Sequence, residues 1–562
     1  MLQAEFMSPQ NHQWRCGSFA RLLRAGNAER PAPEGGPYNS SRFAPLALLA
    51  LLLAVSPVPR AHAQARQARP IAPSDRAAHA LDAARGNPLE LRALLLRMPK
   101  GADLHVHLSG AVYAESWIRA GAEDNLCIEL ATLAFTKIDS MTRGTPPQPV
   151  CGEGKVPAAQ ALKDQSLYDK LIDSFSMRSF VPSVGVSGHD HFFDTFNKFR
   201  GTSKHHTGEW LDEVTSRAAA QNEQYLELME TPDFGHTASI AGQVEWTEDF
   251  AKLREALLAR GLREDVAVAA THFDEAQGLR RERQHCGQAA PFPACNVQIR
   301  YLYQALRGLP KEIVFAQTLL GFEIASADPR VVGVNIVMPE DGYVSMHDYA
   351  LHMRMFAYLH SVYPKVHISL HAGELAPGLV TWEGLCCHVR LAVEKGAAER
   401  IGHGVDVLYE EQPYDLMKEM AEKHVMVEVN LSSNDLILGV GGDHHPFPLY
   451  RKNHVPVALS TDDEGVSRID LTSEYVRAME TYKLGYADLK QMARTGLEHS
   501  FLPGVSLWSK PDDFGKTANA CARDTSGAAH PSKPCADFLK TSEKAQQQWE
   551  LERRFRTFEE SF

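Results

Sequence analysis

The chain has 562 residues, of which 44% are hydrophobic and 23% are charged, and its formal net charge is -12 at pH 7. A chain of this length and composition can bury one large core or two ordinary ones, which excludes a fibrous or wholly disordered protein. An acidic balance without a basic patch or tail also argues against a nucleic-acid partner. We therefore expect a soluble globular protein that does not bind polynucleotides.

Residues 1–63 have the pattern of an export signal. Arg30 and Arg42 precede an apolar run over residues 46–55, and an Ala-His-Ala sequence ending at Ala63 places small residues where a signal peptidase reads them. The apolar run is too short for a permanent transmembrane helix, although an N-terminal membrane anchor is the alternative interpretation. We predict cleavage after Ala63, export to the periplasm or the extracellular space, and no stable membrane association afterwards.

Short apolar runs alternate with longer helix-like segments from residue 89 to residue 504. Eight of these runs are expected to be strands: 102–108, 224–229, 297–303, 331–337, 366–371, 400–404, 425–430 and 457–461. Strands that alternate with helices predict a parallel sheet with right-handed crossovers, and eight strands close a barrel. We predict an α/β fold, a (β/α)8 TIM barrel, after a flexible segment rich in Ala, Arg and Pro at 64–88.

Two further segments accompany this barrel. The connection after the first strand is too long for one helix, so we expect residues 110–215 to form an inserted helical subdomain over the barrel mouth. Its Phe192, Phe196 and Phe199 have helical spacing, which indicates core packing or, alternatively, an apolar lid. Residues 505–562 should form a C-terminal extension with a helical segment that packs on the barrel or mediates self-association, for example in a homodimer.

Cysteine usage agrees with export. Six of the eight cysteines after residue 63 fall into sequence-local pairs: Cys127 with Cys151, Cys286 with Cys295, and Cys521 with Cys535. Disulfides are typical of an oxidising compartment, and unpaired thiols are the alternative interpretation. Cys386 and Cys387 are adjacent in a helical pattern, so we expect at least one of them to be simply buried.

Polar residues that can bind a metal stand at the carboxyl ends of the expected strands. They are His105 and His107 on the first strand, His371 on the fifth, His403 on the sixth, and Asp462 and Asp463 after the eighth. Residues two apart in a strand project to the same side, so the first two histidines could grip one ion. A single histidine would more often be structural, but (β/α)8 enzymes carry their active site at this end, and six matched positions indicate such a site.

Five segments resemble motifs of the adenosine deaminase family, in the metal-dependent amidohydrolase superfamily. They are residues 98–110, 371–374, 400–404, 428–434 and 460–463. The pattern is most similar to the larger secreted branch that includes the adenosine deaminase-related growth factors. No single motif is decisive, but their order and spacing together are specific for the family.

The resemblance implies a ligand set and three catalytic roles. It implies one Zn2+ per chain, bound by His105, His107, His371 and Asp462. Nitrogen and carboxylate ligands suit zinc, which lowers the pKa of a bound water towards about 7. Glu374 would then be the general acid that protonates N1 of the purine. His403 would orient the nucleophile, and Asp463 would pair with N7 of the purine.

The chain departs from the family pattern at positions that concern the substrate. Ser109 and Gly110 follow the two histidines where the family usually has Asp-Gly, whose aspartate is associated with the ribose. Ser109 can form a hydrogen bond but offers no charged acceptor. Met338 or Pro339 stands where the family has a glycine that contacts purine N3, and a proline has no amide hydrogen to donate. Glu340 is expected to take a neighbouring role.

These observations predict an exported, zinc-dependent purine nucleoside aminohydrolase that converts adenosine or 2'-deoxyadenosine to inosine or deoxyinosine and ammonia. One alternative is the same reaction on adenine, an N6-substituted adenosine or AMP, although the motif segments lack the clustered Arg or Lys that a phosphate would need. A second alternative is an extracellular nucleoside-binding or signalling protein with vestigial catalysis. The intact ligand set beside Glu374 and His403 argues against it.

Overall fold

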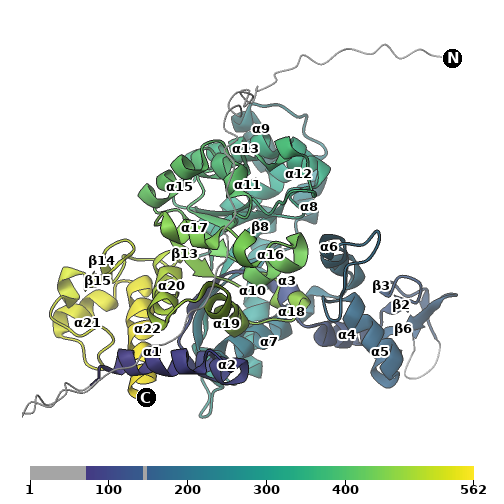
Figure 1. The fold of residues 1–562 in the computed structure, drawn as a ribbon. Coiled ribbons are helices and arrows are strands. Elements are labelled where there is room, and N and C mark those ends of the chain that lie inside the picture. The colour runs from purple at the N-terminus through teal and green to yellow at the C-terminus, as the bar shows by residue number, and fades with distance from the viewer. Residues whose placement is uncertain (1–70, 143–148) are drawn as a thin grey trace, which may run out of the picture. The chain divides into compact units, whose positions relative to one another are not determined.

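The computed structural model describes residues 71–142 and 149–562 (Figure 1). The predicted signal peptide at 1–63 and the segment 64–70 lie outside the described residues. Within the two described ranges, the search for helices of the length and apolarity that a bilayer crossing needs finds none.

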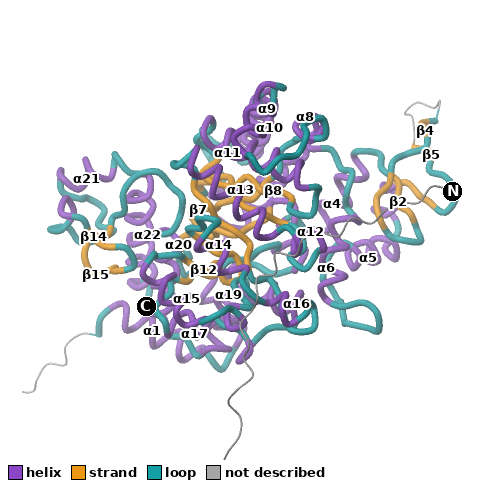
Figure 2. Tube along the Cα trace, turned by 90° about the horizontal axis from the view of Figure 1, so that it is seen from above, coloured by secondary structure: helices purple, strands orange, loops and turns teal. Residues whose placement is uncertain are grey.

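Eight parallel strands form the barrel at the centre of the protein, and helices surround it (Figure 2). In sheet order they are β1 (Gly101–His107), β7 (Glu223–Glu230), β8 (Gln298–Leu306), β9 (Val331–Val337), β10 (His367–Ala372), β11 (Arg400–His403), β12 (Met426–Val429) and β13 (Val457–Leu459). The barrel closes between its last and first strands just beyond β13. There Asp462 donates its backbone N–H to the carbonyl of His105 at 2.9 Å. The predicted (β/α)8 barrel is confirmed, and each expected apolar run overlaps its strand.

The strands are apolar along most of their length because other side chains cover both of their faces. Seven helices in the connections around the barrel are α10 (Glu264–Arg283), α11 (Lys311–Ala327), α13 (Tyr349–Val362), α14 (His388–Glu394), α15 (Pro413–Glu422), α17 (Phe447–Lys452) and α20 (Tyr486–Glu498). Leu319 and Phe322 of α11 are fully buried, as are Met353 and Leu359 of α13. The core therefore lies both inside the barrel and between the strands and the outer helices.

Six further helices lie around the barrel. They are α8 (Gly235–Ala241), α9 (Phe250–Ala259), α12 (Tyr343–His347), α16 (Leu431–Leu438), α18 (Glu464–Ser467) and α19 (Leu471–Tyr482). Of these, α16 directly follows β12, and α18 begins directly after Asp463. These two helices thus begin at the carboxyl ends of their strands, where the candidate site residues stand.

The connection between β1 and β7 is the expected insertion, but it is not wholly helical. Its helices are α3 (Leu108–Ala111), α4 (Ala114–Glu123), α5 (Gln165–Ser174), α6 (Gly188–Lys198) and α7 (Thr207–Ala220). Between α4 and α5 lie a three-stranded antiparallel sheet of β2 (Cys127–Glu129), β3 (Ala134–Thr136) and β6 (Lys155–Pro157), and a pair β4 (Ser140–Met141) and β5 (Pro149–Val150). Strands of two or three residues are too short to give a periodic sequence pattern, which is why the sheet was not predicted.

The aromatic face of α6 packs inside the insertion. Phe192 and Phe199 are 2% and 4% exposed, and the ring of Phe199 stacks on Trp117 at 4.5 Å. Phe196 contacts Phe199 edge to face at 5.5 Å. Core packing, the first of the two interpretations of this pattern, therefore describes these rings.

The segment expected to be flexible at 64–88 is helical over much of its described part. Helix α1 (Pro73–Ala84) buries Ala77, Leu81 and Ala84, and α2 (Pro88–Arg97) follows it. Composition misled the prediction because a segment rich in Ala, Arg and Pro resembles a linker. Alanine is nevertheless the strongest helix former, and proline is favoured at the first position of a helix, where both Pro73 and Pro88 stand.

The C-terminal extension packs on the barrel, one of its two expected roles. It consists of a hairpin of β14 (Trp508–Lys510) and β15 (Asp513–Thr517) and of helices α21 (Lys533–Leu539) and α22 (Glu543–Glu560). Helix α22 contacts α20, β1 and β7, and Figure 1 shows it beside α20. Arg494 of α20 donates two hydrogen bonds to Glu552 of α22, at 2.6 and 2.7 Å.

All eight described cysteines are in disulfides. The three predicted pairs, Cys127–Cys151, Cys286–Cys295 and Cys521–Cys535, are confirmed. The prediction for Cys386 and Cys387 was wrong, because these neighbours are bonded to each other and neither is fully buried. Cys387 has a φ of 88° and directly precedes α14, so the pair lies outside the helix whose pattern it seemed to continue.

Candidate active site

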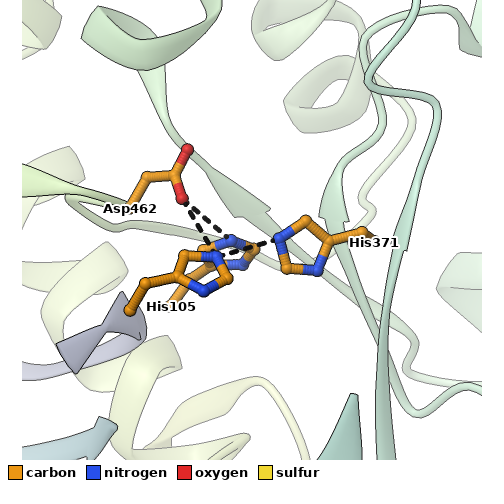
Figure 3. Close-up of side chains that lie close together, drawn as sticks. His105, His371 and Asp462 are labelled. Carbon is orange, nitrogen blue, oxygen red and sulfur yellow. Dashed lines mark hydrogen bonds and ion pairs between the residues drawn. The ribbon is translucent and has the colours of Figure 1, made fainter. Parts of the chain in front are cut away.

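Four predicted ligand residues meet at the carboxyl end of the barrel (Figure 3). They are His105 and His107 of β1, His371 of β10 and Asp462 after β13, and their ligand atoms all lie within 4.8 Å of one another. Asp462 Oδ1 lies 3.5 Å from His105 Nε2 and 3.3 Å from His107 Nε2. Since β1 and β13 are neighbours in the closed barrel and β10 lies across it, only the folded barrel brings these residues together.

Each of the three histidines is oriented by an acceptor on its Nδ1. The pairs are His105 with Glu428 at 2.6 Å, His107 with Gln304 at 2.8 Å, and His371 with Asn335 at 2.8 Å. A histidine that donates its Nδ1 proton in this way keeps the lone pair on Nε2, as metal-binding histidines generally do. Three Nε2 atoms therefore present lone pairs to one centre.

This arrangement fits a divalent cation. His107 Nε2 and His371 Nε2 lie 3.1 Å apart, and His105 Nε2 is buried without a hydrogen-bond partner among the described residues. Lone pairs and a carboxylate that face one another repel unless a positive charge lies between them. Burial and the neighbouring histidines hold the pKa of His371 well below its usual range, so this ring stays neutral and able to bind a metal. Nitrogen and oxygen ligands of this number suit zinc.

Asp462 is held from two sides. Ser433 donates its hydroxyl to Asp462 Oδ2 at 2.6 Å, which leaves Oδ1 facing the histidines. Its backbone has a φ of 62°, and the adjacent Thr461 is tied to β1 through Asp103, whose Oδ2 accepts the Thr461 N–H at 3.0 Å and its hydroxyl at 2.7 Å. The first residue of the Asp-Leu-His-Val-His motif thus fixes the end of the eighth strand.

Glu374 lies beside this cluster, on the loop that follows β10. Its side chain is 7% exposed, and Oε1 lies 3.9 Å from His403 Nε2. Burial, followed by the charge of Asp462, raises the pKa of Glu374 well above its usual range. A carboxylic acid with a raised pKa holds its proton to higher pH and can donate it, which is what a general acid requires.

His403 ends β11 as a neutral ring. Asn434 donates its side-chain N–H to His403 Nδ1 at 2.8 Å, and the amide oxygen of Asn434 pairs with His445 Nε2 at 3.0 Å. Burial lowers the pKa of His403 to about 3, so its single proton resides on Nε2. This Nε2 has no hydrogen-bond partner among the described residues and lies 3.9 Å from Asp462 Oδ2. It is a donor directed at the cluster.

Asp463 is buried against Gly110. A Cβ atom at Gly110 would lie 1.5 Å from Asp463 Oδ1, so only glycine leaves room for this carboxyl group. Asp463 Oδ1 has no hydrogen-bond partner among the described residues. Burial raises the pKa of Asp463 well above its usual range. Ser109, next to Gly110 on α3, is half-buried.

Glu340 has a different place from the one expected beside the substrate. Its carboxylate accepts the backbone N–H of Gly373 at 3.0 Å and of Glu374 at 2.8 Å, and it pairs with His388 Nδ1 at 2.5 Å. Although burial alone would raise it, Arg307 and His388 lower the pKa of Glu340 to about 2. With both oxygens engaged, Glu340 holds the loop that carries Glu374 and is not free to bind a substrate.

Met338 lies in a more exposed environment than Glu340. It is 37% exposed, its φ is 91°, and its carbonyl accepts a hydrogen bond from Arg307 Nε at 2.9 Å. Its side chain lies over Gly308, where a Cβ atom would come within 2.8 Å of the methionine methyl group. Met338 remains accessible to a ligand, whereas Glu340 does not.

Several residues of the site were not predicted to take part in it. Gln304 and Asn335 are polar residues in the mainly apolar strands β8 and β9, a signal that could have been found in the sequence. Glu428 and Asn434 belong to a motif that was recognised, but their contacts were not predicted. All four act on a histidine of the site through a hydrogen bond.

The fold and this cluster together define the class of protein. Parallel (β/α)8 barrels carry catalytic groups at this end of their strands, and the ligand set fits the hydrolases among them that work with a bound metal. The model of the adenosine deaminase family matches residues 213–506, which is more than half of the chain. The chain belongs to the adenosine deaminase family.

A known relative matches a shorter stretch. The adenosine deaminase of Clostridium perfringens is 36% identical over 135 residues, which are 24% of this chain and 37% of that protein. The chain therefore spans little more than a third of the length of the relative that it matches.

The solved structures with a similar backbone have lower sequence identity to this chain than the Clostridium relative has. An amidohydrolase with bound Zn from Burkholderia ambifaria is 15% identical, with a TM-score of 0.48 over 74% of this chain and 88% of that one. The adenine deaminase of Arthrobacter aurescens is 15% identical, with a TM-score of 0.43 over 72% and 94%. The N6-mAMP deaminase of Arabidopsis is 17% identical, with a TM-score of 0.46 over 73% and 95%.

Proposed function

We propose that the protein is an exported, zinc-dependent aminohydrolase that converts adenosine or 2'-deoxyadenosine to inosine or deoxyinosine and ammonia. Membership of the adenosine deaminase family supports the class of reaction. The observation that carries the proposal is the position of Glu374 and His403 beside four residues that fit a metal. Burial raises the pKa of Glu374 and lowers the pKa of His403, which suits an acid and a neutral ring. A nucleoside-binding protein without catalysis has no use for a buried acid at this place.

The metal would be held by His105, His107, His371 and Asp462. When bound, a zinc ion supplies a water of lowered pKa, near about 7, and so a nucleophile at neutral pH. Glu428, Gln304 and Asn335 hold the three rings in the orientation that this binding needs. Such oriented ligands bind more tightly because less freedom is lost on binding.

Glu374 would move the proton that the reaction needs. Addition of oxygen to C6 pushes electrons onto the purine ring, and Glu374 donates its proton to N1 as this bond forms. The resulting carboxylate then takes a proton from the new hydroxyl group and passes it to the amino group, and it would regain its own proton from the water that supplies the nucleophile. The C6–N bond breaks, ammonia leaves, and the proton on N1 stays with the product.

His403 and Asp463 would position the reacting groups. The Nε2–H of His403 is directed at the cluster, where it can hydrogen-bond the attacking oxygen. Asp463, with its raised pKa and unpartnered Oδ1, is suited to donate a hydrogen bond to N7, which is an acceptor. Orientation of this kind converts a bimolecular reaction into an effectively intramolecular one.

Turnover of a substrate panel tests the proposal. Adenosine, 2'-deoxyadenosine, adenine, AMP and N6-methyladenosine are each incubated with the full chain, and ammonia is measured with and without a metal chelator. We expect adenosine or deoxyadenosine to give the highest kcat/KM, and chelation to abolish release. Preference for adenine or AMP would refute the nucleoside assignment while keeping the deaminase. Binding of nucleosides without any ammonia release would refute the enzyme.

The four disulfides support the proposal of export. Disulfides form and persist in the periplasm or outside the cell and are rare in reducing compartments, and every described cysteine is paired. The export signal itself is a feature of the sequence at 1–63. N-terminal sequencing of protein recovered from the periplasm or the medium should begin at residue 64. Recovery of the chain only from the cytoplasm, with its leader intact, would refute export.

A further inference from the structure

A second group of metal-binding side chains lies in the insertion, on elements that the proposed mechanism does not use. It consists of Asp124 at the end of α4, and of His205 and His206 in the turn Lys204–His206 that precedes α7. Their ligand atoms lie within 4.8 Å of one another. The two histidine rings are neighbours, with centroids 4.0 Å apart.

His206 is the buried member of this group and lies between two carboxylates. Its side chain is 2% exposed, with Nδ1 3.1 Å from Glu209 Oε2 and Nε2 3.2 Å from Asp124 Oδ1. A neutral imidazole has one N–H, so it can donate to only one of these oxygens. When Nδ1–H donates to Glu209, the lone pair of Nε2 faces the lone pairs of Asp124. A cation at this place removes the conflict.

His205 places a second imidazole nitrogen near the same oxygen atom, Asp124 Oδ1. Its Nε2 lies 3.8 Å from Asp124 Oδ1, and its Nδ1 lies 2.6 Å from Ser203 Oγ, which can accept the Nδ1 proton and leave Nε2 free. The other oxygen of Asp124 accepts the backbone N–H of Ser203 at 2.5 Å. Each of the three ligands thus has a hydrogen bond at the atom that faces away from the others. Such outer contacts orient the ligands of protein metal sites.

The spacing and the charge of the group agree with a metal site. Ligands at about 2.0–2.2 Å from a tetrahedral zinc lie roughly 3.3–3.6 Å from one another, and the observed separations from Asp124 Oδ1 are 3.2 and 3.8 Å. The side chain of His205 is 66% exposed, so a small rotation can close the longer gap. Glu123 and Glu209 add negative charge nearby, which is partly offset by Arg119 at 3.9 Å from Glu123 and by Arg283 at 3.2 Å from Glu209.

We propose that Asp124, His205 and His206 form a second metal site, which binds a divalent transition-metal ion such as Zn2+. Two nitrogens and one oxygen leave a coordination position open for water on the exposed side of His205. Asp124 and His206 are 82 positions apart in the chain, so the ion would link the end of α4 to the turn before α7. This site is independent of the proposed catalysis.

Metal stoichiometry tests the proposal. The full chain is stripped with a chelator, reloaded with Zn2+ and passed through a desalting column, and bound metal is measured by atomic emission. We expect two ions per wild-type chain, one in His205→Ala, one in His371→Ala and none in the double variant. His205 is exposed, so its loss should not prevent folding. His347→Ala is the matched control, since His347 is 67% exposed and also pairs with a carboxylate, and it should bind two.

The variants separate the two sites. Equal metal content in the wild type and His205→Ala would overturn the proposal. One ion in both the wild type and His371→Ala, with none in His205→Ala, would support the insertion site and contradict the catalytic one. Added Zn2+ should also raise the melting temperature of His371→Ala more than that of the double variant. Equal shifts would contradict the link across the insertion.

Discussion

Glu340 accepts the backbone N–H of Glu374 at 2.8 Å, so a buried carboxylate from the loop after β9 fixes the residue that carries the proposed general acid after β10. The neighbouring Gly373 N–H binds the other Glu340 oxygen at 3.0 Å. Two bonds to successive N–H groups leave the loop little freedom. The proton donor is therefore placed before any substrate arrives.

Glu340→Gln should impair the placement of Glu374. The new amide would direct N–H hydrogens at a backbone N–H, which removes at least one hydrogen bond and leaves a donor unpaired. Because small misplacements of catalytic groups are costly, we expect kcat to fall by about 10–100-fold while bound metal is unchanged. Steady-state kinetics and metal analysis measure both. Glu411→Gln, which changes an exposed glutamate in the same way, should leave kcat unaltered, and a comparable loss in that control would argue against positioning.

Gly110→Ala should displace Asp463. The added methyl group would lie 1.5 Å from Asp463 Oδ1, closer than any contact allows. We expect kcat/KM for adenosine to fall by at least about 100-fold. Gly278→Ala is the matched control, since nothing lies within 4 Å of its Cβ position in α10, and alanine there should stabilise the fold by about 0.5–1 kcal/mol without changing activity. Full activity of Gly110→Ala would show that Asp463 has no part in the reaction.

The pair of His189 and Asp341 should make the attachment of the insertion depend on pH. His189 Nε2 on α6 lies 2.9 Å from Asp341 Oδ1, next to Glu340. Burial by itself lowers the pKa of His189, but the hydrogen bond and charge of Asp341 outweigh it and raise the pKa above the usual value. A raised pKa means that the pair stabilises fully below the unfolded pKa of about 6.5 and is lost as the pH rises through the folded value.

Chemical denaturation of the wild type and His189→Gln tests this dependence. The difference in unfolding free energy should be larger at about pH 6 than at about pH 9. Asp341→Asn should show the same trend, because it removes the charge that raises the pKa. A difference that grows with pH in either variant would contradict the assignment.

Cys535→Ser should destabilise the C-terminal extension. The disulfide Cys521–Cys535 closes a loop with a sequence separation of 14, and bonds over loops of about this length stabilise by roughly 3 kcal/mol. Because α22 packs on α20, β1 and β7, loosening the extension should lower the melting temperature of the barrel as well. Calorimetry that finds an unchanged melting transition would show that the extension unfolds independently.

The barrel and the meeting of the site residues could be predicted because both follow from patterns within short segments. Apolar runs of strand length marked the eight barrel strands, β1 and β7 to β13, and His105, His371 and Asp462 each stand at the end of one. Contacts between different strands and their loops could not be predicted in the same way. The pairing of His107 with Gln304, or of Glu340 with the Glu374 N–H, depends on which groups of separate strands and loops face each other in the folded barrel, and no local pattern encodes that.

The errors have physical reasons of the same kind. Helix α1 was predicted to be flexible from its composition. The helix is stabilised by packing on α20 and α22, which are distant in the sequence, so the local composition does not reveal these contacts. Cys386 and Cys387 were assigned to a helix by periodicity, although α14 begins only at His388. In both cases tertiary contacts or a covalent bond decided a local structure that composition alone could not.

Ammonia release from adenosine by the wild type and by Glu374→Gln, with bound zinc measured in each, tests the central claim most directly. Glutamine has nearly the shape of glutamic acid but cannot deliver the proton to N1. We predict that the wild type releases ammonia, and that Glu374→Gln keeps its metal and loses turnover by about 100–10,000-fold. A Glu374→Gln enzyme with full metal content and full activity would contradict the account.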